Sequence, residues 1–182
     1  MRPTTDRARE SVFAVIAAHL GTADGPPEAQ LAGLRFLDLY AGSGAVGLEA
    51  ASRGASATWV EADPAVARLI MANCRELGLV PDVVTATVEN WLTQPVRRRG
   101  AGGAGTAGYD IVWLDPPYDC STDHVGDVIA VAVQRDWVRP GGLILAERSA
   151  RSPALEFPEN LLNNGTRRYG ETVVYLAQKA VA

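Results

Sequence analysis

The sequence feature that most constrains the fold is an apolar segment that leads directly into a glycine-rich turn. Residues 34–40 have the composition of a buried strand, and Gly42-Ser-Gly44-Ala-Val-Gly47 follows at once and opens a helix that we expect to end near Arg53. Glycines permit a tight turn and let a bound molecule lie close to the backbone. A strand, a glycine turn and a helix in this order begin a βαβ unit, in which the next strand lies parallel to the first.

The remainder of the chain continues this alternation. Further strands are expected at residues 57–61, 83–87, 109–115, 143–147 and 169–177, with a turn at 140–142 and an irregular stretch before residue 169. Helices are expected at residues 1–20, capped by Thr4 or Thr5, at 64–77 and at 125–137, with a short helical turn at 89–92. This order predicts an α/β fold with a doubly wound, mostly parallel sheet of about seven strands and helices on both faces. The last strand is expected to be antiparallel because its connection is short.

The length and composition indicate one globular domain spanning residues 1–182, since 47% of its residues are hydrophobic. The net charge of −4 excludes a chain that is polycationic throughout, so contacts with nucleic acid have to come from local basic patches. Cys74 and Cys120 are far apart and lack metal-ligand spacing. We therefore expect no metal site and no disulfide framework, and a reduced cytoplasmic setting. No signal peptide or membrane-spanning segment is visible.

A second motif stands where the strand at 109–115 ends. In Asp115-Pro-Pro-Tyr118 the two prolines cannot donate backbone hydrogen bonds, so the chain leaves the sheet there as a stiff loop. The Asp115 carboxylate and the Pro116 carbonyl suit the two N–H bonds of an exocyclic amino group on a nucleobase, and Tyr118 suits stacking on that base. The plainer interpretation is a Pro-Pro turn, with Asp115 as a turn acceptor and Tyr118 as a surface aromatic.

The glycine turn and its acidic neighbours indicate a cofactor that contains a nucleoside. The turn fits the G-x-G-x-x-G pattern, and Glu61 follows about 20 residues later, where a carboxylate accepts hydrogen bonds from ribose hydroxyls. NAD fits this spacing. Asp38, four residues before Gly42, favours a cationic sulfonium over an anionic pyrophosphate, and therefore S-adenosylmethionine. Thr87 and Val88 would border the adenine. A glycine turn that binds no ligand is the simplest alternative.

At this point the chain resembles a known family. Asp38-Leu-Tyr-Ala-Gly-Ser-Gly44 together with Asp115-Pro-Pro-Tyr118 looks like the amino-group methyltransferases of the Rossmann-like, S-adenosylmethionine-dependent superfamily, which modify adenine N6, cytosine N4 or guanine N2. More specific segments are Arg2-Pro-Thr-Thr-Asp-Arg-Ala-Arg-Glu10, Leu48-Glu-Ala-Ala-Ser-Arg-Gly-Ala55, Glu147-Arg148 and Arg168-Tyr-Gly170. With these, nearly the whole chain is similar to the bacterial 16S ribosomal RNA guanine-N2 methyltransferases.

This resemblance implies a monomeric enzyme that uses S-adenosylmethionine, without a metal, to methylate the exocyclic N2 of a specific guanine in 16S rRNA of the small ribosomal subunit. The implied catalytic residues are Asp115, Pro116, Pro117 and Tyr118. The implied cofactor-binding residues are Asp38, Tyr40, Ala41, Gly42, Ser43, Gly44, Glu61, Ala62, Thr87, Val88 and Asp115. RNA contacts are implied for Arg2, Thr4, Arg7 and Arg9, whereas composition alone favours a solvated polar face for these arginines.

Alternatives to this interpretation stay open. The family usually carries a short basic segment ahead of the Arg-Pro-Thr-Thr-Asp-Arg motif, which here follows Met1 directly. Either the start is truncated, or RNA is held differently, with the arginines at 97–99 in a flexible loop at 97–108 as one hypothesis. The rival functions are a DNA or RNA adenine-N6 or cytosine-N4 methyltransferase, an NAD-dependent dehydrogenase, and a cofactor-binding assembly factor without activity. A DNA enzyme usually needs a target-recognition region, for which this chain has room only in short loops.

Overall fold

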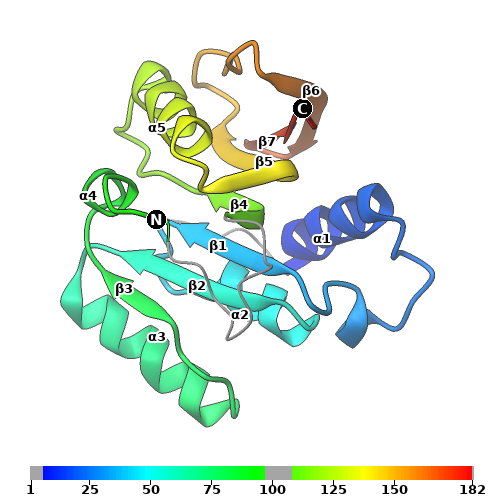
Figure 1. Ribbon diagram of the computed structural model, residues 1–182, viewed down its shortest axis with the longest axis vertical. Coiled ribbons are helices and arrows are strands. Elements are labelled where there is room, and N and C mark those ends of the chain that lie inside the picture. The colour runs from blue at the N-terminus through cyan, green and yellow to red at the C-terminus, as the bar shows by residue number, and fades with distance from the viewer. Residues whose placement is uncertain (1–5, 97–107, 182) are drawn as a thin grey trace.

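The computed structural model describes residues 6–96 and 108–181 (Figure 1). Its helices are α1 (Asp6–Leu20), the 3-10 turn η1 (Pro27–Ala29), α2 (Ala45–Ser52), α3 (Pro64–Glu76), α4 (Val88–Leu92) and α5 (Thr122–Gln134). Its strands are β1 (Arg35–Leu39), β2 (Ser56–Glu61), β3 (Val83–Thr85), β4 (Tyr109–Leu114), β5 (Val138–Ser149), β6 (Leu161–Tyr169) and β7 (Thr172–Lys179). The predicted caps Thr4 and Thr5 and residues 97–107 of the predicted loop lie outside the described residues. No helix within the two described ranges is both long and apolar enough to cross a lipid bilayer.

The strands form one seven-stranded sheet in the order β3-β2-β1-β4-β5-β7-β6. The five strands from β3 to β5 are parallel, whereas β7 is antiparallel to β5 and β6 is antiparallel to β7. From β1 the chain builds outward through β2 and β3, and from β4 it builds in the opposite direction. The predicted doubly wound sheet with a final antiparallel strand is confirmed. Its topological switch point lies between β1 and β4, where ligands bind in folds of this type.

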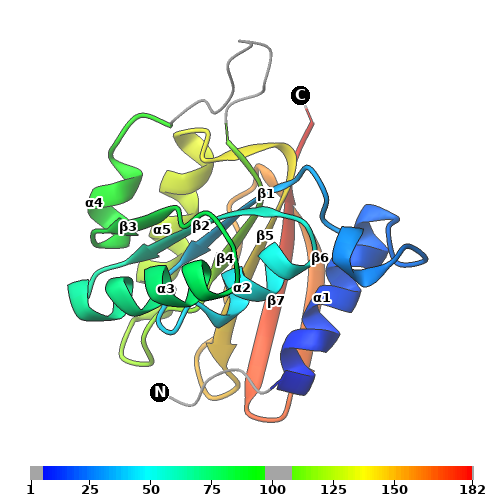
Figure 2. The same cartoon turned by 90° about the horizontal axis from the view of Figure 1, so that it is seen from below.

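The sheet is buried on both faces, as a parallel sheet with helical crossovers requires. On one face α1, α2 and α3 cover Phe36, Trp59 and Trp113. On the other face α4 and α5 cover Leu37 and Val112, so neighbouring residues along a strand point to opposite layers. Figure 2 shows α2 and α3 in front of the strands and α5 behind them. The predicted placement of helices on both faces is therefore correct.

Strand β3 and helix α5 differ from their predicted bounds because of helix caps. Strand β3 ends at Thr85 rather than Thr87, because the Thr87 hydroxyl accepts a hydrogen bond from the Asn90 amide (3.3 Å) and caps α4. Helix α5 begins three residues before the predicted residue 125, because Ser121 caps it in the same way, and it ends at Gln134. Both caps fix the first helical turns that border the site.

The C-terminal half of the sheet differs from the prediction in three respects. Strand β5 is longer than the predicted 143–147, because the turn at 140–142 is a bulge inside the strand: Tyr109 of β4 pairs with Val138, and Ile111 pairs with Leu143. Strand β6 occupies the stretch predicted to be irregular. It lacks an apolar alternation because it is an edge strand whose side chains are mostly exposed. The last strand begins at Thr172, not at residue 169.

Candidate active site

The candidate site lies where the carboxyl ends of β1 and β4 meet. The two strands are paired up to Leu39 and Leu114, and the Asp115 amide lies 3.5 Å from the Leu39 carbonyl oxygen. The chain turns away from both strands immediately afterwards and leaves a cavity of about 260 Å³. The cavity is lined by Tyr40, Gly42, Val60, Glu61, Ala62, Ala86, Thr87, Val88, Glu89, Asp115 and Pro117. The structure thus brings the glycine turn, the end of β2, the start of α4 and the proline loop together, as the sequence predicts.

The glycine turn is held by close packing against β2. Gly47 lies on α2 over the indole of Trp59, and a Cβ added there would come within 2.6 Å of Cε2 of that ring. The Trp59 Nε1–H donates a hydrogen bond to the Gly44 carbonyl oxygen (3.1 Å), while Gly44 has a φ of 77° that favours glycine. Tyr40, which is not a glycine, has a φ of 61° at the start of the turn. Such backbone geometry in a residue with a Cβ is uncommon and concentrates at functional sites.

Asp38 lies beneath the turn and does not line the cavity. Its side chain is 1% exposed, and Oδ2 accepts a hydrogen bond from the Gly47 amide (2.9 Å). Burial raises the pKa of Asp38 well above its usual range, the Gly47 amide opposes this, and the charges of Asp115 and Glu61 add to the rise. This hydrogen bond holds the start of α2, and the predicted contact between Asp38 and a cofactor stays a prediction. Ala41, Ser43 and Gly44, also predicted to bind the cofactor, are likewise not among the lining residues.

Glu61 occupies the position predicted for it at the end of β2, with its carboxylate at the cavity wall. Oε2 accepts a hydrogen bond from the Gly42 amide and Oε1 accepts one from the Asp63 amide, both at 2.8 Å. These two contacts with backbone amides fix the carboxylate. An oxygen held in this way keeps free lone pairs for further donors, such as vicinal hydroxyl groups.

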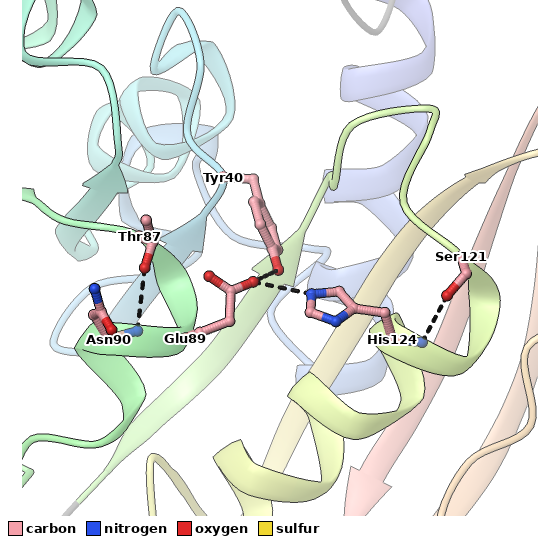
Figure 3. Close-up of polar contacts among 6 residues, drawn as sticks. All are labelled: Tyr40, Thr87, Glu89, Asn90, Ser121 and His124. Carbon is pink, nitrogen blue, oxygen red and sulfur yellow. Dashed lines mark hydrogen bonds and ion pairs between the residues drawn. The ribbon is translucent and has the colours of Figure 1, made fainter.

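The rim of the cavity contains a polar contact that the sequence analysis missed (Figure 3). Glu89 Oε1 accepts a hydrogen bond from the Tyr40 hydroxyl (3.2 Å) and lies 2.9 Å from Nε2 of His124. Burial acts to raise the pKa of Glu89, but hydrogen bonds from its own amide, His124, Tyr40 and Thr87 lower it overall. The contact joins the end of β1, α4 and α5 across one side of the cavity. No sequence signal pairs Glu89 with His124, which is 35 positions away.

The proline loop presents Asp115 to the cavity and Tyr118 to solvent. Pro116 is buried, whereas Tyr118 is 64% exposed, and the loop closes through a hydrogen bond from the Cys120 amide to the Pro117 carbonyl (3.0 Å). Burial raises the pKa of Asp115 to about 7; the charge of Glu147 adds to the rise and that of Arg148 opposes it. A carboxylate beside a freely exposed aromatic ring can accept hydrogen bonds from a planar amine that stacks on the ring.

The predicted RNA contacts are only partly within the described residues. Arg2 and Thr4 lie outside them. Arg7 is exposed and Arg9 is partly buried, both in the first two turns of α1. In Figure 2 the start of α1 lies at the same edge of the sheet as the turn between β6 and β7. The role of these arginines stays a prediction.

Known proteins are similar to this chain over most of its length. The profile of a family described as conserved hypothetical protein 95 matches residues 1–178. A protein of Escherichia coli named ribosomal RNA small subunit methyltransferase D is 30% identical over 181 residues, which cover 98% of this chain and 80% of that protein. A protein of the same name from Haemophilus influenzae is 28% identical over 164 residues, covering 88% of this chain and 74% of that protein.

Solved structures agree with these sequence comparisons. The structure of the putative methyltransferase yhhF from Escherichia coli superposes with a TM-score of 0.80 at 27% identity, and the match covers 100% of this chain and 90% of that one. The sheet order and the glycine turn described above are thus those of a Rossmann-like methyltransferase. The chain therefore belongs to the family described as conserved hypothetical protein 95, that is, to the bacterial 16S ribosomal RNA methyltransferases.

Proposed function

We propose that this protein transfers a methyl group from S-adenosylmethionine to the exocyclic N2 of one guanine in 16S rRNA of the small ribosomal subunit. The observation that carries the proposal is the cavity at the switch point, whose wall includes both Glu61 and Asp115. The proposed cofactor site at Glu61 and the proposed amino-group acceptor Asp115 therefore adjoin the same space. The names of the relatives support ribosomal RNA of the small subunit as the substrate.

The cavity suits a cationic cofactor. Glu61, Glu89 and Asp115 line it, so carboxyl groups border the space on several sides. A sulfonium with an adenosine on one arm gains from this potential, whereas a pyrophosphate is repelled. Glu61 accepts the ribose hydroxyls in this proposal, and Ala62, Thr87 and Val88 border the adenine. The glycine turn from Tyr40 to Gly44 takes the methionine part.

The chemistry is a displacement at the sulfonium methyl group. The N2 lone pair of guanine forms the new N–C bond while the C–S bond breaks, and its electrons stay on sulfur to give neutral S-adenosylhomocysteine. The nitrogen becomes cationic and loses one proton to Asp115 or to water. Before transfer, the Asp115 carboxylate and the Pro116 carbonyl accept hydrogen bonds from the two N–H groups of the amine. These bonds orient the nitrogen lone pair toward the methyl group. Tyr118 holds the base by stacking, which its exposure permits.

The partners follow from the same proposal. The protein acts in the cytoplasm as a monomer without a metal ion, and Arg2, Thr4, Arg7 and Arg9 contribute contacts to the RNA. Local contacts are needed because the chain carries a net charge of −4 and has no overall attraction for phosphate. The arginines at residues 97–99 add to these contacts in the same proposal.

The test uses small subunits from a strain that lacks the modification. Purified protein is incubated with them and with S-adenosylmethionine carrying a labelled methyl group, and the digested RNA is analysed by mass spectrometry for N2-methylguanosine. Asp115→Ala is expected to abolish transfer while calorimetry shows nearly unchanged binding of S-adenosylhomocysteine. Asp119→Ala is the matched control, because Asp119 lies exposed in the same loop.

Three results would overturn the proposal. One is labelled N6-methyladenosine or N4-methylcytidine as the product, since the rival methyltransferases form these. A second is full activity of Asp115→Ala. A third is calorimetric binding of NAD in place of S-adenosylhomocysteine.

A further inference from the structure

We propose that Arg148 is a positioning residue, which anchors the loop carrying Asp115 and Tyr118 to β5 and holds a fixed positive charge beside the Asp115 carboxylate. The inference rests on the proposed function, because it concerns the geometry of the methyl-accepting side of that site. Arg148 touches neither the proposed cofactor nor the proposed base, and acts through the loop.

The contacts of Arg148 connect three elements. It lies next to the last residue of β5 and is only 5% exposed. Its Nη2 donates a hydrogen bond to the Cys120 carbonyl oxygen (2.8 Å) and lies 3.5 Å from Oγ1 of Thr122, the first residue of α5. One side chain therefore joins the end of β5, the end of the proline loop and the start of α5.

The loop depends on such an anchor. Pro116 and Pro117 supply no N–H groups, so this part of the chain cannot be held by a ladder of backbone hydrogen bonds. At the start of the loop, the Asp115 amide donates a long hydrogen bond (3.5 Å) to the Leu39 carbonyl oxygen. The bond from Arg148 to Cys120 fixes the other end, two residues after Tyr118. Without it the exposed Tyr118 ring loses its defined position relative to Asp115.

Arg148 also shares a wall with the reactive carboxylate. A second, small cavity of about 10 Å³ is lined by Asp115, Pro116, Tyr118, Glu147, Arg148, Ser149, Ser152 and Thr172. The guanidinium Nε is buried and makes no hydrogen bond to any residue that the structure describes. Burial of an incompletely paired guanidinium lowers the stability of the folded state. A functional role of Arg148 is consistent with this loss of stability.

The ionisable groups around Asp115 are mostly acidic. They are Asp38 of β1, Glu61 of β2, Glu89 of α4 with its partner His124 of α5, Glu147 and Arg148 of β5, and Tyr40, Tyr118, Asp119 and Cys120 of the connecting loops. In this set Arg148 is the permanent cation. Its charge lowers the pKa of Asp115, against burial and the charge of Glu147, which raise it. Removal of the charge leaves more of the Asp115 population protonated and unable to accept a hydrogen bond from an amine.

The experiment compares Arg148→Gln, which loses the charge, with Arg148→Lys, which keeps it. Arg151→Gln is the control, because Arg151 is exposed three residues further on and pairs with Glu171. Methyl transfer to small subunits is measured from pH 6 to 8.5. If loss of the charge raises the pKa of Asp115 by about one unit, the loss of kcat at pH 7 exceeds the loss at pH 8.5 by about four-fold. We expect Arg148→Lys to restore the wild-type acid limb, and Arg151→Gln to leave it unchanged.

A second measurement does not depend on the substrate. Carboxyl carbon resonances of Asp115 are titrated by NMR in the wild type and in Arg148→Gln, with calorimetry of S-adenosylhomocysteine as a check of folding. We expect the Asp115 midpoint to move to higher pH in Arg148→Gln. Equal midpoints in both proteins, or an unshifted acid limb, overturn the inference. If wild-type protein does not form N2-methylguanosine, the proposed function fails, while the NMR titration still decides the role of Arg148.

Discussion

Substitution of Gly47 by Ala tests whether the packing under the glycine turn is as tight as the structure shows. In an ordinary helix this change stabilises by about 1 kcal/mol, because alanine has the higher helix propensity. Here the new Cβ would lie within 2.6 Å of Cε2 of Trp59, whose side chain is 1% exposed and has no space to move. Overpacking of this kind costs about 1–3 kcal/mol. Displacing the indole also breaks its hydrogen bond to the Gly44 carbonyl, which costs about 1–3 kcal/mol more.

The expected net effect of Gly47→Ala is a destabilisation of about 1–5 kcal/mol, opposite in sign to the usual one. Urea unfolding followed by tryptophan fluorescence measures it. The matched control is Gly126→Ala on α5, where the added Cβ meets no atom within 4 Å and about 0.5–1 kcal/mol of stabilisation is expected. In a Trp59→Phe background the cost of Gly47→Ala should fall by at least about 1 kcal/mol. A Gly47→Ala protein as stable as the wild type would refute the packing argument.

The remaining predictions concern charge. Glu61→Gln should weaken S-adenosylhomocysteine binding by about 10-fold or more, because a charged acceptor is lost, and calorimetry measures this. Folding raises the pKa of the Asp115 carboxyl group to about 7. The protonated group therefore contributes stability to the folded state that is fully present below about pH 4 and is lost as the pH rises through 7. Asp115→Asn should therefore stabilise the protein by about 2 kcal/mol at pH 8 but have little effect at pH 4, and equal effects at both pH values in urea titrations would contradict this assignment. His124→Ala should change stability by less than about 1 kcal/mol, because both partners of its pair with Glu89 are about half exposed, and a larger loss in thermal unfolding would show that the contact matters more.

The parts of the fold that local sequence specifies were predictable. Strand β1 and the turn beginning at Gly42 lie where the pattern places them, because a buried apolar run and glycines with positive φ act over a few residues. The order of strands and helices then determined the sheet. Strand β6 was missed because nothing local marks it: Asn163 and Asn164 are poor strand formers, and the strand exists through its pairing with β7.

The site was predictable to the extent that it follows from strand ends. Asp115 and Glu61 both line the cavity, because the carboxyl ends of parallel strands converge. The hydrogen bond from the Gly47 amide to Asp38 was not predicted, since it depends on the distance between β1 and that amide. The contact between Glu89 and His124 was also missed, because the sequence does not indicate how close α4 and α5 approach each other.

The two outer strands of the sheet have a consequence for how this protein behaves at high concentration. Strand β3 is only three residues long, so it offers little template for another chain. At the opposite border, β6 carries a register shift between Asn163 and Thr166 and the exposed arginines 167 and 168. Irregular, charged or very short borders discourage strand addition from neighbouring molecules. Both edge strands of the sheet therefore resist pairing with strands of other molecules, which disfavours aggregation at high protein concentration.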